Sequence, residues 1–208
     1  MRERILDLCN QRFRQRGIRN YSMDELASEL GVSKKTIYQY FPKKKDIVQG
    51  FVERWTQADE AQLQEQVLRN HHPIDLMIEI LQSIQQDLST INPIMFQDLR
   101  RFFPEAWELM HHFRNQYVRQ SVEGHIQKGI ELGVFRSDLN TEIVIELQLR
   151  IIDMIINVYF DMQGKYSLQL IQYHEMMLLM YGMCSPKGAA DLDARLNAPD
   201  SPVVRPTH

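Results

Sequence analysis

The chain has 208 residues, of which 44% are hydrophobic and 25% charged, and its formal net charge is −3. This composition is ordinary for a soluble globular protein and allows one or two compact domains. The two cysteines, Cys9 and Cys184, suggest no disulfide framework, so we expect a reducing, cytoplasmic location. The charged N-terminus has no signal-peptide core and no apolar run is long enough to span a bilayer, so no membrane partner is expected.

Charge is distributed unevenly along the chain. Residues 1–50 contain eleven lysines and arginines against six acidic residues, a net charge of +5, which leaves −8 for the remainder. A basic head on an acidic body indicates that the head meets a polyanion and that the body does not. A chance imbalance of charge is the alternative interpretation.

Apolar residues recur at spacings of three and four almost throughout, which predicts an all-α fold. We expect a first helix over roughly 2–16, ended by Gly17. Pro73, Pro93 and Pro104 each suit the first turn of a later helix. The later helices are expected at 44–69, 74–91, 94–103, 105–132, 140–163 and 167–183, and a polar tail at 185–208 is expected to be mostly disordered.

Two short helices joined by a tight turn are predicted directly after the first helix. Ser22 can cap the earlier one, and Glu25 can reach back to complete a capping box. Gly31 and Val32 form the whole connection before Ser33 caps the next helix, and the glycine suits a left-handed turn. Helices joined so closely must cross steeply. The pattern therefore predicts a helix-turn-helix, whose second helix would enter a DNA major groove.

The helices expected over 140–163 and 167–183 are apolar on nearly every side. Such a helix is buried on two sides, one within its own chain and one against a further partner. The simplest partner is a second copy of the same helix pair, which predicts a homodimer with a four-helix interface. A large monomeric core is the alternative.

The segment from Phe13 to Gly17, followed by YSMDELASELGVSKKTIYQYFPKKKDIV, resembles the tetracycline-repressor (TetR) family of bacterial transcriptional regulators. A generic helix-turn-helix pattern would lack the Tyr-x-Tyr-Phe ending. Looser similarity continues in PEAWELMHHFRN and GIELGVFRSDLN, which look like the family's long seventh helix and the turn after it. The resemblance implies a three-helix DNA-binding domain over 1–45 and a helical ligand-binding and dimerisation domain over 46–184.

The resemblance also implies candidate DNA contacts. The candidates are Ser22, Ser33, Lys34, Lys35, Thr36, Tyr38, Gln39, Tyr40 and Lys44. Tyr38, Tyr40 and Lys44 match positions that clamp the phosphate backbone, and the others on the second helix lie nearest the bases. Lysine can neutralise phosphate or donate to guanine, and glutamine can read adenine. Which of Lys34, Lys35, Thr36 and Gln39 touches a base stays open.

Two positions depart from the family pattern. Lys35 stands where many relatives have glycine or another small residue, so the fit into the groove can differ. Lys43 stands where a helix-capping serine or threonine is common, which removes a cap and adds a cation.

A pocket for an unidentified small effector is expected in the helical body, both from the resemblance and from its methionines. Eleven methionines, most of them between residues 77 and 183, would provide an adaptable apolar interior. Methionines that merely fill gaps in the core are the alternative. The candidate contacts are polar or aromatic side chains among apolar ones, namely Gln85, Trp107, His111, Arg114, Tyr117 and Gln148.

No residue pattern indicates catalysis or a metal. His71-His72 and His111-His112 are adjacent pairs, and neighbours on a helix point about 100° apart, which suits chelation poorly. The His-x-x-x-His spacing, a glycine-rich phosphate loop and a nucleophile elbow are all missing from the sequence. We therefore expect no enzyme activity, no cofactor and no metal.

The leading hypothesis is a homodimeric, ligand-released repressor that binds a near-palindromic operator. A second hypothesis is a helical enzyme or carrier for a lipid-like molecule, whose basic head meets an anion. A third is a nonspecific nucleoid protein. The capped helix-turn-helix argues against the second hypothesis, and the acidic body argues against the third.

Overall fold

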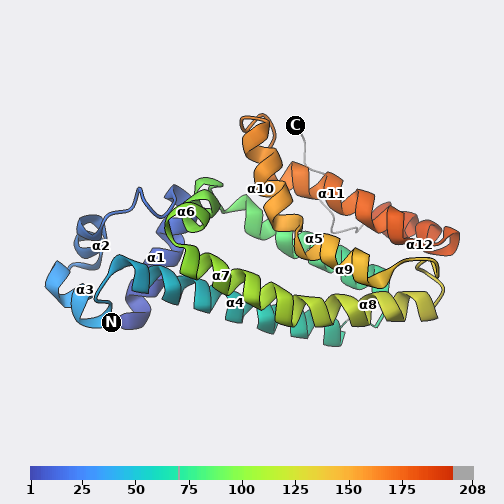
Figure 1. Cartoon of the computed structure of the whole chain (residues 1–208), viewed down its shortest axis with the longest axis horizontal. Coiled ribbons are helices and arrows are strands. Elements are labelled where there is room, and N and C mark those ends of the chain that lie inside the picture. Colours follow the sequence, from blue (N-terminus) through green and yellow to red (C-terminus); the bar gives the residue numbers. More distant parts are fainter. Residues whose placement is uncertain (70, 199–208) are drawn as a thin grey trace. The chain divides into compact units, whose positions relative to one another are not determined.

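The computed structural model describes residues 1–69 and 71–198, which form helices joined by turns (Figure 1). The expected all-α class is confirmed. Within the described residues the only β pairing is an isolated bridge between Phe135 and Cys184. The helices are α1 (Arg2–Arg16), α2 (Met23–Leu30), α3 (Lys34–Tyr40), α4 (Lys44–Arg69), α5 (Pro73–Ser89), α6 (Ile94–Phe102), α7 (Pro104–Phe113), the π-helical η1 (Arg114–Val118), α8 (Arg119–Glu131), α9 (Thr141–Leu149), α10 (Ile151–Asp161), α11 (Leu168–Met183) and α12 (Pro186–Leu196).

Contacts divide the chain into two compact units. The first unit comprises Met1–Glu60 with Thr90–Phe113, and the second comprises Ala61–Ser89 with the described residues from Arg114 onward. This division differs from the expected boundary after residue 45, because the first part of α4 together with α6 and α7 groups with the three N-terminal helices. No helix in the described part of the chain is long and apolar enough to cross a membrane.

Aromatic rings form the centre of the first unit. Phe13 meets Tyr21 and Phe51 edge-on, at centroid distances of 6.2 and 5.5 Å. Trp55 then lies 5.8 Å from Phe51 and 5.9 Å from Phe96, so the rings form a continuous series from α1 through α4 to α6. Such ring pairs stabilise a core beyond the area that they bury. They explain why α6 belongs to the same unit as the helix-turn-helix.

α6 also holds the connection between α1 and α2. The buried Asp98 carboxylate accepts a hydrogen bond of 2.8 Å from the backbone N–H of Arg19. The guanidinium of the same arginine lies 4.2 Å from the centroid of the Phe102 ring, within range of a cation–π contact. Asn92, just before α6, donates its backbone N–H to the carbonyl of Arg14 over 2.6 Å. The compact unit around the helix-turn-helix is therefore larger than the three helices that the resemblance implies.

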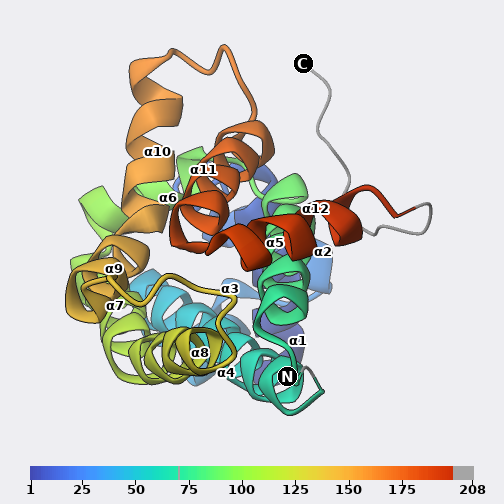
Figure 2. The same cartoon turned by 90° about the vertical axis from the view of Figure 1, so that its right-hand side faces the viewer.

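The core of the second unit gathers residues from α5, α8, α9, α11 and α12. Figure 2 shows α5 and α12 beside α11, and α5 contacts both α11 and α12. Their buried apolar side chains form one cluster, which consists of Ile74, Met77, Ile78, Leu81, Ile126, Val134, Phe135, Ile145, Leu149, Met176, Met180, Met183, Cys184 and Leu192. Four of these are methionines, whose flexible side chains allow the core to change shape more easily than leucine or isoleucine would.

Two helices that the sequence predicts as continuous are interrupted. The expected helix over 105–132 contains the π-helical turn η1, and the expected helix over 140–163 breaks at Arg150, where φ is −97° and ψ is 0°. A π turn inserts one extra residue into the helical ladder. Because apolar residues surround both segments, apolar periodicity alone does not reveal either interruption.

The expectation of a disordered tail over 185–208 is wrong for its first part. Ser185 caps α12, with its side chain accepting from the N–H of Gly188 over 3.1 Å, and Leu192 of α12 is fully buried. Proline and polar residues made this segment resemble disordered chain, but Pro186 stands in the first turn of the helix, where proline is tolerated. Residues 199–208 lie outside the described part of the chain.

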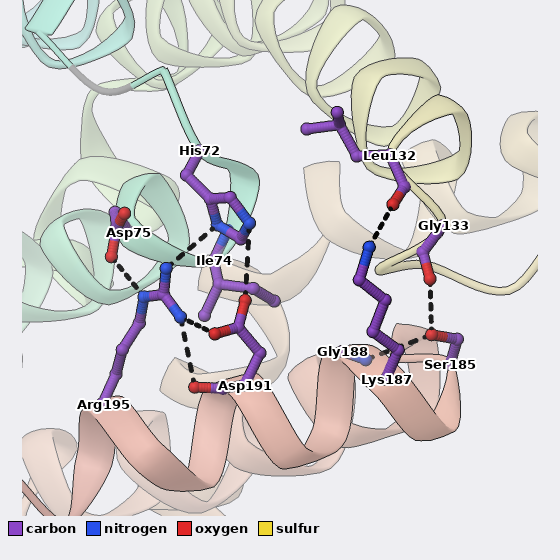
Figure 3. Close-up of polar contacts among 10 residues, drawn as sticks. All are labelled: His72, Ile74, Asp75, Leu132, Gly133, Ser185, Lys187, Gly188, Asp191 and Arg195. Atoms are coloured by element: carbon purple, nitrogen blue, oxygen red, sulfur yellow. Dashed lines mark hydrogen bonds and ion pairs between the residues drawn. The ribbon is translucent and has the colours of Figure 1, made fainter.

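Polar contacts hold α12 to the rest of the second unit (Figure 3). Near its start, the hydroxyl of Ser185 donates to the carbonyl of Gly133 over 2.7 Å, and the Lys187 ammonium donates to the carbonyl of Leu132 over 3.0 Å. Near its end, Arg195 forms ion pairs with Asp75 of α5 and with Asp191 one turn earlier. These contacts with distant segments, rather than local composition, order the helix.

Candidate nucleic-acid interface

The predicted helix-turn-helix is confirmed in its local geometry. The Ser22 side chain accepts from the N–H of Glu25 over 3.2 Å, and the Glu25 carboxylate accepts from the N–H of Ser22 over 2.8 Å. This capping box lowers the pKa of Glu25, because its carboxylate accepts hydrogen bonds. At the end of α2, Gly31 adopts φ 68° and ψ 33°, the left-handed conformation that lets α3 start three residues later.

Capping also fixes the start of α3. The Ser33 side chain accepts from the N–H of Thr36 over 3.1 Å, and the two hydroxyl oxygens lie 3.0 Å apart. Ile37 is fully buried and anchors the inner side of the helix. Ser33 and Thr36 therefore have hydroxyls engaged with each other, although Ser33 itself is exposed.

Four side chains of α3 extend from its outer side, namely those of Lys35, Tyr38, Gln39 and Tyr40. All are exposed, and the two tyrosines retain 43% and 47% of their surface. None of the four forms a hydrogen bond or ion pair within residues 1–69 and 71–198. The ammonium, the amide and the two phenols are therefore not engaged by other described residues. They can form contacts with phosphates and base edges.

Lys34 stands apart from these four. Its ammonium forms an ion pair of 2.8 Å with Asp24 of α2, and the hydrogen bond that it donates to this carboxylate raises the pKa of Lys34. Both side chains are exposed, so the pair contributes little stability. Lys34 can therefore exchange Asp24 for a phosphate or a base at small cost.

Lys44 has a different environment from the phosphate clamp that the resemblance implies. Its ammonium donates to the backbone carbonyls of Ile18 and Tyr21, over 2.7 and 2.6 Å. The side chain is partly buried, and this burial lowers its pKa. Two of its three N–H donors thus hold the connection between α1 and α2.

Position 43 keeps part of a helix cap despite the lysine. The backbone N–H of Lys43 donates to the Asp46 carboxylate over 2.8 Å, which is one half of a capping box. The Lys43 side chain is exposed, so α4 begins with a capped backbone and an additional solvent-facing cation. This role of Asp46 was not predicted from the sequence, although its spacing of three residues from position 43 could have indicated it.

The six candidate effector contacts fall into both units. Trp107 and His111 belong to the first unit, where their rings meet edge-on at 5.2 Å. The candidates in the second unit are Gln85, Arg114, Tyr117 and Gln148. Because the six are divided between two units, their role as one effector site stays a prediction.

Two of the candidates in the second unit have defined contacts. Arg114 is buried in η1, and its guanidinium lies 3.8 Å from the carboxylate of Asp153 on α10. Burial lowers the pKa of this guanidinium, whereas Asp153 opposes that shift. Gln148 donates to the sulfur of Met183 over 3.7 Å. In the described residues no group of three potential metal ligands gathers at one place.

An all-helical chain with an N-terminal helix-turn-helix, whose second helix exposes lysine, glutamine and tyrosine, has the architecture of a DNA-binding regulator. Residues 5–50 match the model of the family described as "Bacterial regulatory proteins, tetR family". Over these residues, which run from α1 into the start of α4, the chain is similar to that family.

Curated relatives cover part of the chain. The uncharacterized HTH-type transcriptional regulator YvaF of Bacillus subtilis is 28% identical over 109 residues, which are 51% of this chain and 56% of YvaF. The HTH-type transcriptional regulator SAUSA300_2515 of Staphylococcus aureus is 34% identical over 53 residues, which are 26% of this chain and 29% of that protein. The chain thus spans less than two thirds of the length of each. Both relatives carry the name of an HTH-type transcriptional regulator.

Solved structures share the fold over most of the chain. A putative transcriptional regulator from Saccharomonospora viridis, in complex with choline, has a TM-score of 0.71 at 20% identity and covers 88% of this chain and 97% of its own. FadR from Bacillus subtilis, in complex with stearoyl-CoA, has a TM-score of 0.65 at 18% identity, with coverage of 88% and 100%. At these identities the similarity concerns the fold alone.

Proposed function

We propose that the chain is a sequence-specific DNA-binding transcriptional regulator of the cytoplasm. The exposed outer side of α3 is the observation that carries this proposal. Lys35 and Gln39 lie one turn apart and would face the base edges, whereas the phenols of Tyr38 and Tyr40 would donate to phosphate oxygens. Base contacts would select the operator, and phosphate contacts would fix the register of the helix in the groove.

The same regulator would act as a homodimer on a near-palindromic operator. Within the second unit, α9 and α11 expose large apolar side chains, of which Leu147 and Leu178 retain 62% and 78% of their surface. Ile143 and Met154 are exposed on the neighbouring turns of α9 and α10. A second copy of these helices would cover this apolar surface. Two recognition helices would then enter successive major grooves, roughly 34–36 Å apart.

We further propose that a small effector releases the repressor from DNA. Structures with this fold hold choline in one case and stearoyl-CoA in another, which supports a ligand-responsive body. α4 contributes residues to both units, from Lys44–Glu60 in the first to Ala61–Arg69 in the second. An effector shifts the DNA-binding equilibrium only by its difference in affinity between the bound and released states.

Fluorescence anisotropy with labelled duplexes tests the DNA-binding function. The wild-type chain would be titrated against the DNA upstream of its own gene and against duplexes enriched from a random pool, at two salt concentrations. We expect saturable binding that weakens with salt. Lys35→Ala should weaken binding about 5- to 100-fold, the range for a lost base contact. The matched control Lys128→Ala, an exposed lysine on α8, should leave affinity unchanged.

Variants of Tyr38 separate its hydroxyl from its ring. We expect Tyr38→Phe to lose the phosphate hydrogen bond and Tyr38→Ala to lose the packing as well, so that affinity falls in that order. Failure of the folded wild-type chain to bind any duplex in the enriched pool would overturn the proposed function. The lipid-like-ligand alternative would then become the leading hypothesis.

A further inference from the structure

α11 carries one polar residue within its buried stripe. Gln172, Met176, Met180 and Met183 recur at helical spacing, and the three methionines belong to the core cluster that α11 forms with α5. Gln172 is only 1% exposed. Neither atom of its amide group has a hydrogen-bond partner within residues 1–69 and 71–198. The stripe therefore contains a carbonyl oxygen and an amino group that the described fold does not use.

An unpartnered buried amide is unusual in a folded protein. Its two polar atoms lose their hydrogen bonds to water on folding and here gain none from the described chain, which costs stability. Methionine has nearly the same length and would fill the same stripe without that cost. The glutamine is therefore better explained by a molecule that supplies the missing hydrogen bonds than by packing.

A carboxyl group lies one helical turn away. Glu175 is three residues after Gln172, so the two side chains are neighbours on the surface of α11. Glu175 is partly buried, and it has no ion pair or hydrogen bond to any other described residue. Burial alone raises its pKa to about 7. A positive charge bound nearby would lower this pKa again and so favour the ionised carboxylate.

The core against which α11 packs is rich in methionine. Four methionines, Met77 of α5 with Met176, Met180 and Met183 of α11, contribute to the core cluster. Methionine is unbranched and polarisable, so it repacks around an inserted apolar chain more readily than leucine or isoleucine. The guanidinium of the buried Arg114 already lies close to the carboxylate of Asp153. Its positive charge therefore does not require an anionic ligand.

We propose that the effector of this regulator is an amphiphile with an aliphatic chain and a primary ammonium head, and that Gln172 and Glu175 hold the head. The ammonium N–H groups would donate to the amide oxygen of Gln172 and to the carboxylate of Glu175. The aliphatic chain would enter the methionine-rich core between α5 and α11. This inference rests on the proposed function only for the regulatory consequence of binding, because the site itself is defined by the side chains of α11.

Isothermal titration calorimetry with three probes of equal chain length tests the chemistry of the head. The probes are dodecylammonium chloride, sodium dodecanoate and 1-dodecanol, each below its micelle concentration, at pH 7.5. We expect one saturable site per chain for dodecylammonium, with an affinity at least tenfold higher than for the other two probes. Equal or tighter binding of dodecanoate or dodecanol would overturn the proposal, as would the absence of saturable dodecylammonium binding.

Two substitutions on α11 test the position of the site. Glu175→Gln should weaken dodecylammonium binding at least tenfold and leave dodecanol binding unchanged. The matched control Glu123→Gln removes the same charge from an exposed position on α8 and should have no effect. Unchanged dodecylammonium affinity in Glu175→Gln would show that the head binds elsewhere.

Gln172→Met distinguishes a role of Gln172 in ligand binding from a role in the stability of the fold. It should raise the Tm, because it removes an unpartnered buried amide, and should also weaken dodecylammonium binding at least fivefold. A lower Tm with unchanged ligand affinity would assign Gln172 to the fold. Circular dichroism would confirm that each variant is folded before its affinity is compared.

Operator binding measured on the same preparations separates the two proposals. A chain that binds its operator but not dodecylammonium would overturn this inference alone. A chain that binds dodecylammonium at α11 but binds no duplex would overturn the proposed function and leave the site intact. If both hold, dodecylammonium should lower operator affinity in the wild type and not in Glu175→Gln.

Discussion

Lys35 and Lys44 are both lysines of the basic head, and the family resemblance assigns both to DNA. Their environments differ. The ammonium of Lys44 donates to two backbone carbonyls, whereas Lys35 is exposed and has no partner among the described residues. A sequence motif indicates that a lysine stands at a position. Only the contacts of that lysine show whether it is available to bind DNA or stabilises the fold.

Substitution of each lysine by methionine should separate these roles. Lys44→Met should lower the free energy of unfolding by about 2 kcal/mol, because it leaves the carbonyls of Ile18 and Tyr21 without their charged donor. Lys35→Met should change it by less than about 0.5 kcal/mol, as is usual at exposed positions, while weakening DNA binding. Urea denaturation measures both values. A Lys44→Met variant as stable as the wild type would contradict the structural role.

His125 predicts a loss of stability in acid. Burial lowers its pKa from 6.5 to about 4, and its ring packs 5.4 Å from that of Phe135. Because the pKa in the folded state lies below the unfolded value, the neutral ring stabilises the fold fully above pH 6.5. This contribution is lost as the pH falls towards 4, and it amounts to as much as about 3 kcal/mol.

Urea denaturation between pH 7.5 and 4.5 checks this expectation. The free energy of unfolding of the wild type should fall more steeply below pH 6.5 than that of His125→Leu. Comparison with this variant is needed because burial also lowers the pKa of His72, which acts in the same direction. Parallel pH profiles for the two proteins would show that His125 does not titrate in this range.

At the scale of elements, the helix-turn-helix could be predicted closely because its signals are local. The capping residues Ser22 and Ser33 and the turn residue Gly31 act on backbone atoms within three residues of themselves. The π turn of η1 and the break at Arg150 could not be predicted, because apolar residues continue on both sides of each interruption and the sequence pattern does not mark where the helical ladder changes. α12 was missed for the same reason, since its ordering contacts lie on α5 and on residues 132–134.

Two glycines of α8 should respond to alanine in opposite ways. A Cβ atom at Gly129 would lie 1.9 Å from a ring carbon of Phe135, whereas one at Gly124 has no atom within 4 Å. Gly124→Ala should raise the free energy of unfolding by about 0.5–1 kcal/mol through helix propensity. Gly129→Ala should lower it by about 1–3 kcal/mol, because the Phe135 ring must move.

Thermal or urea unfolding of the two variants, side by side, measures this difference. Both substitutions make the same chemical change within one helix, so propensity is matched between them. Stabilisation by Gly129→Ala would show that Phe135 can turn away from α8 at little cost.

At the scale of the whole molecule, the chain forms two units, and the expected domain boundary does not coincide with them. The ring contact between Trp55 and Phe96 and the hydrogen bond to the buried Asp98 hold α6 to the helix-turn-helix, although Asp98 lies 79 residues from its partner Arg19 in sequence. Charge asymmetry sets residues 1–50 apart from the remainder, but the extent of the compact unit that contains them depends on contacts between distant helices.

Assembly is the property of the whole molecule that mutation can test most directly. Leu147→Glu combined with Leu178→Glu should convert a dimer into a folded monomer at micromolar concentration, because two charges would be buried in the proposed interface. Sedimentation velocity measures the change. Leu68→Glu, which places the same charge at an equally exposed leucine on α4, should remain dimeric. A dimeric double variant would show that another surface forms the interface.

The sequence by itself determined the helical class, the helix-turn-helix and the cations and phenols of α3. These features depend on periodicity, caps and turns, whose causes lie within a few residues of one another. Tertiary structure decided that Lys44 holds the head together, that α6 belongs to it, that α12 is ordered, and that Gln172 is buried without a described partner. Each of these features depends on which distant segments meet. The sequence alone does not show that a glutamine near several methionines is buried, because its burial depends on the helices that pack against α11.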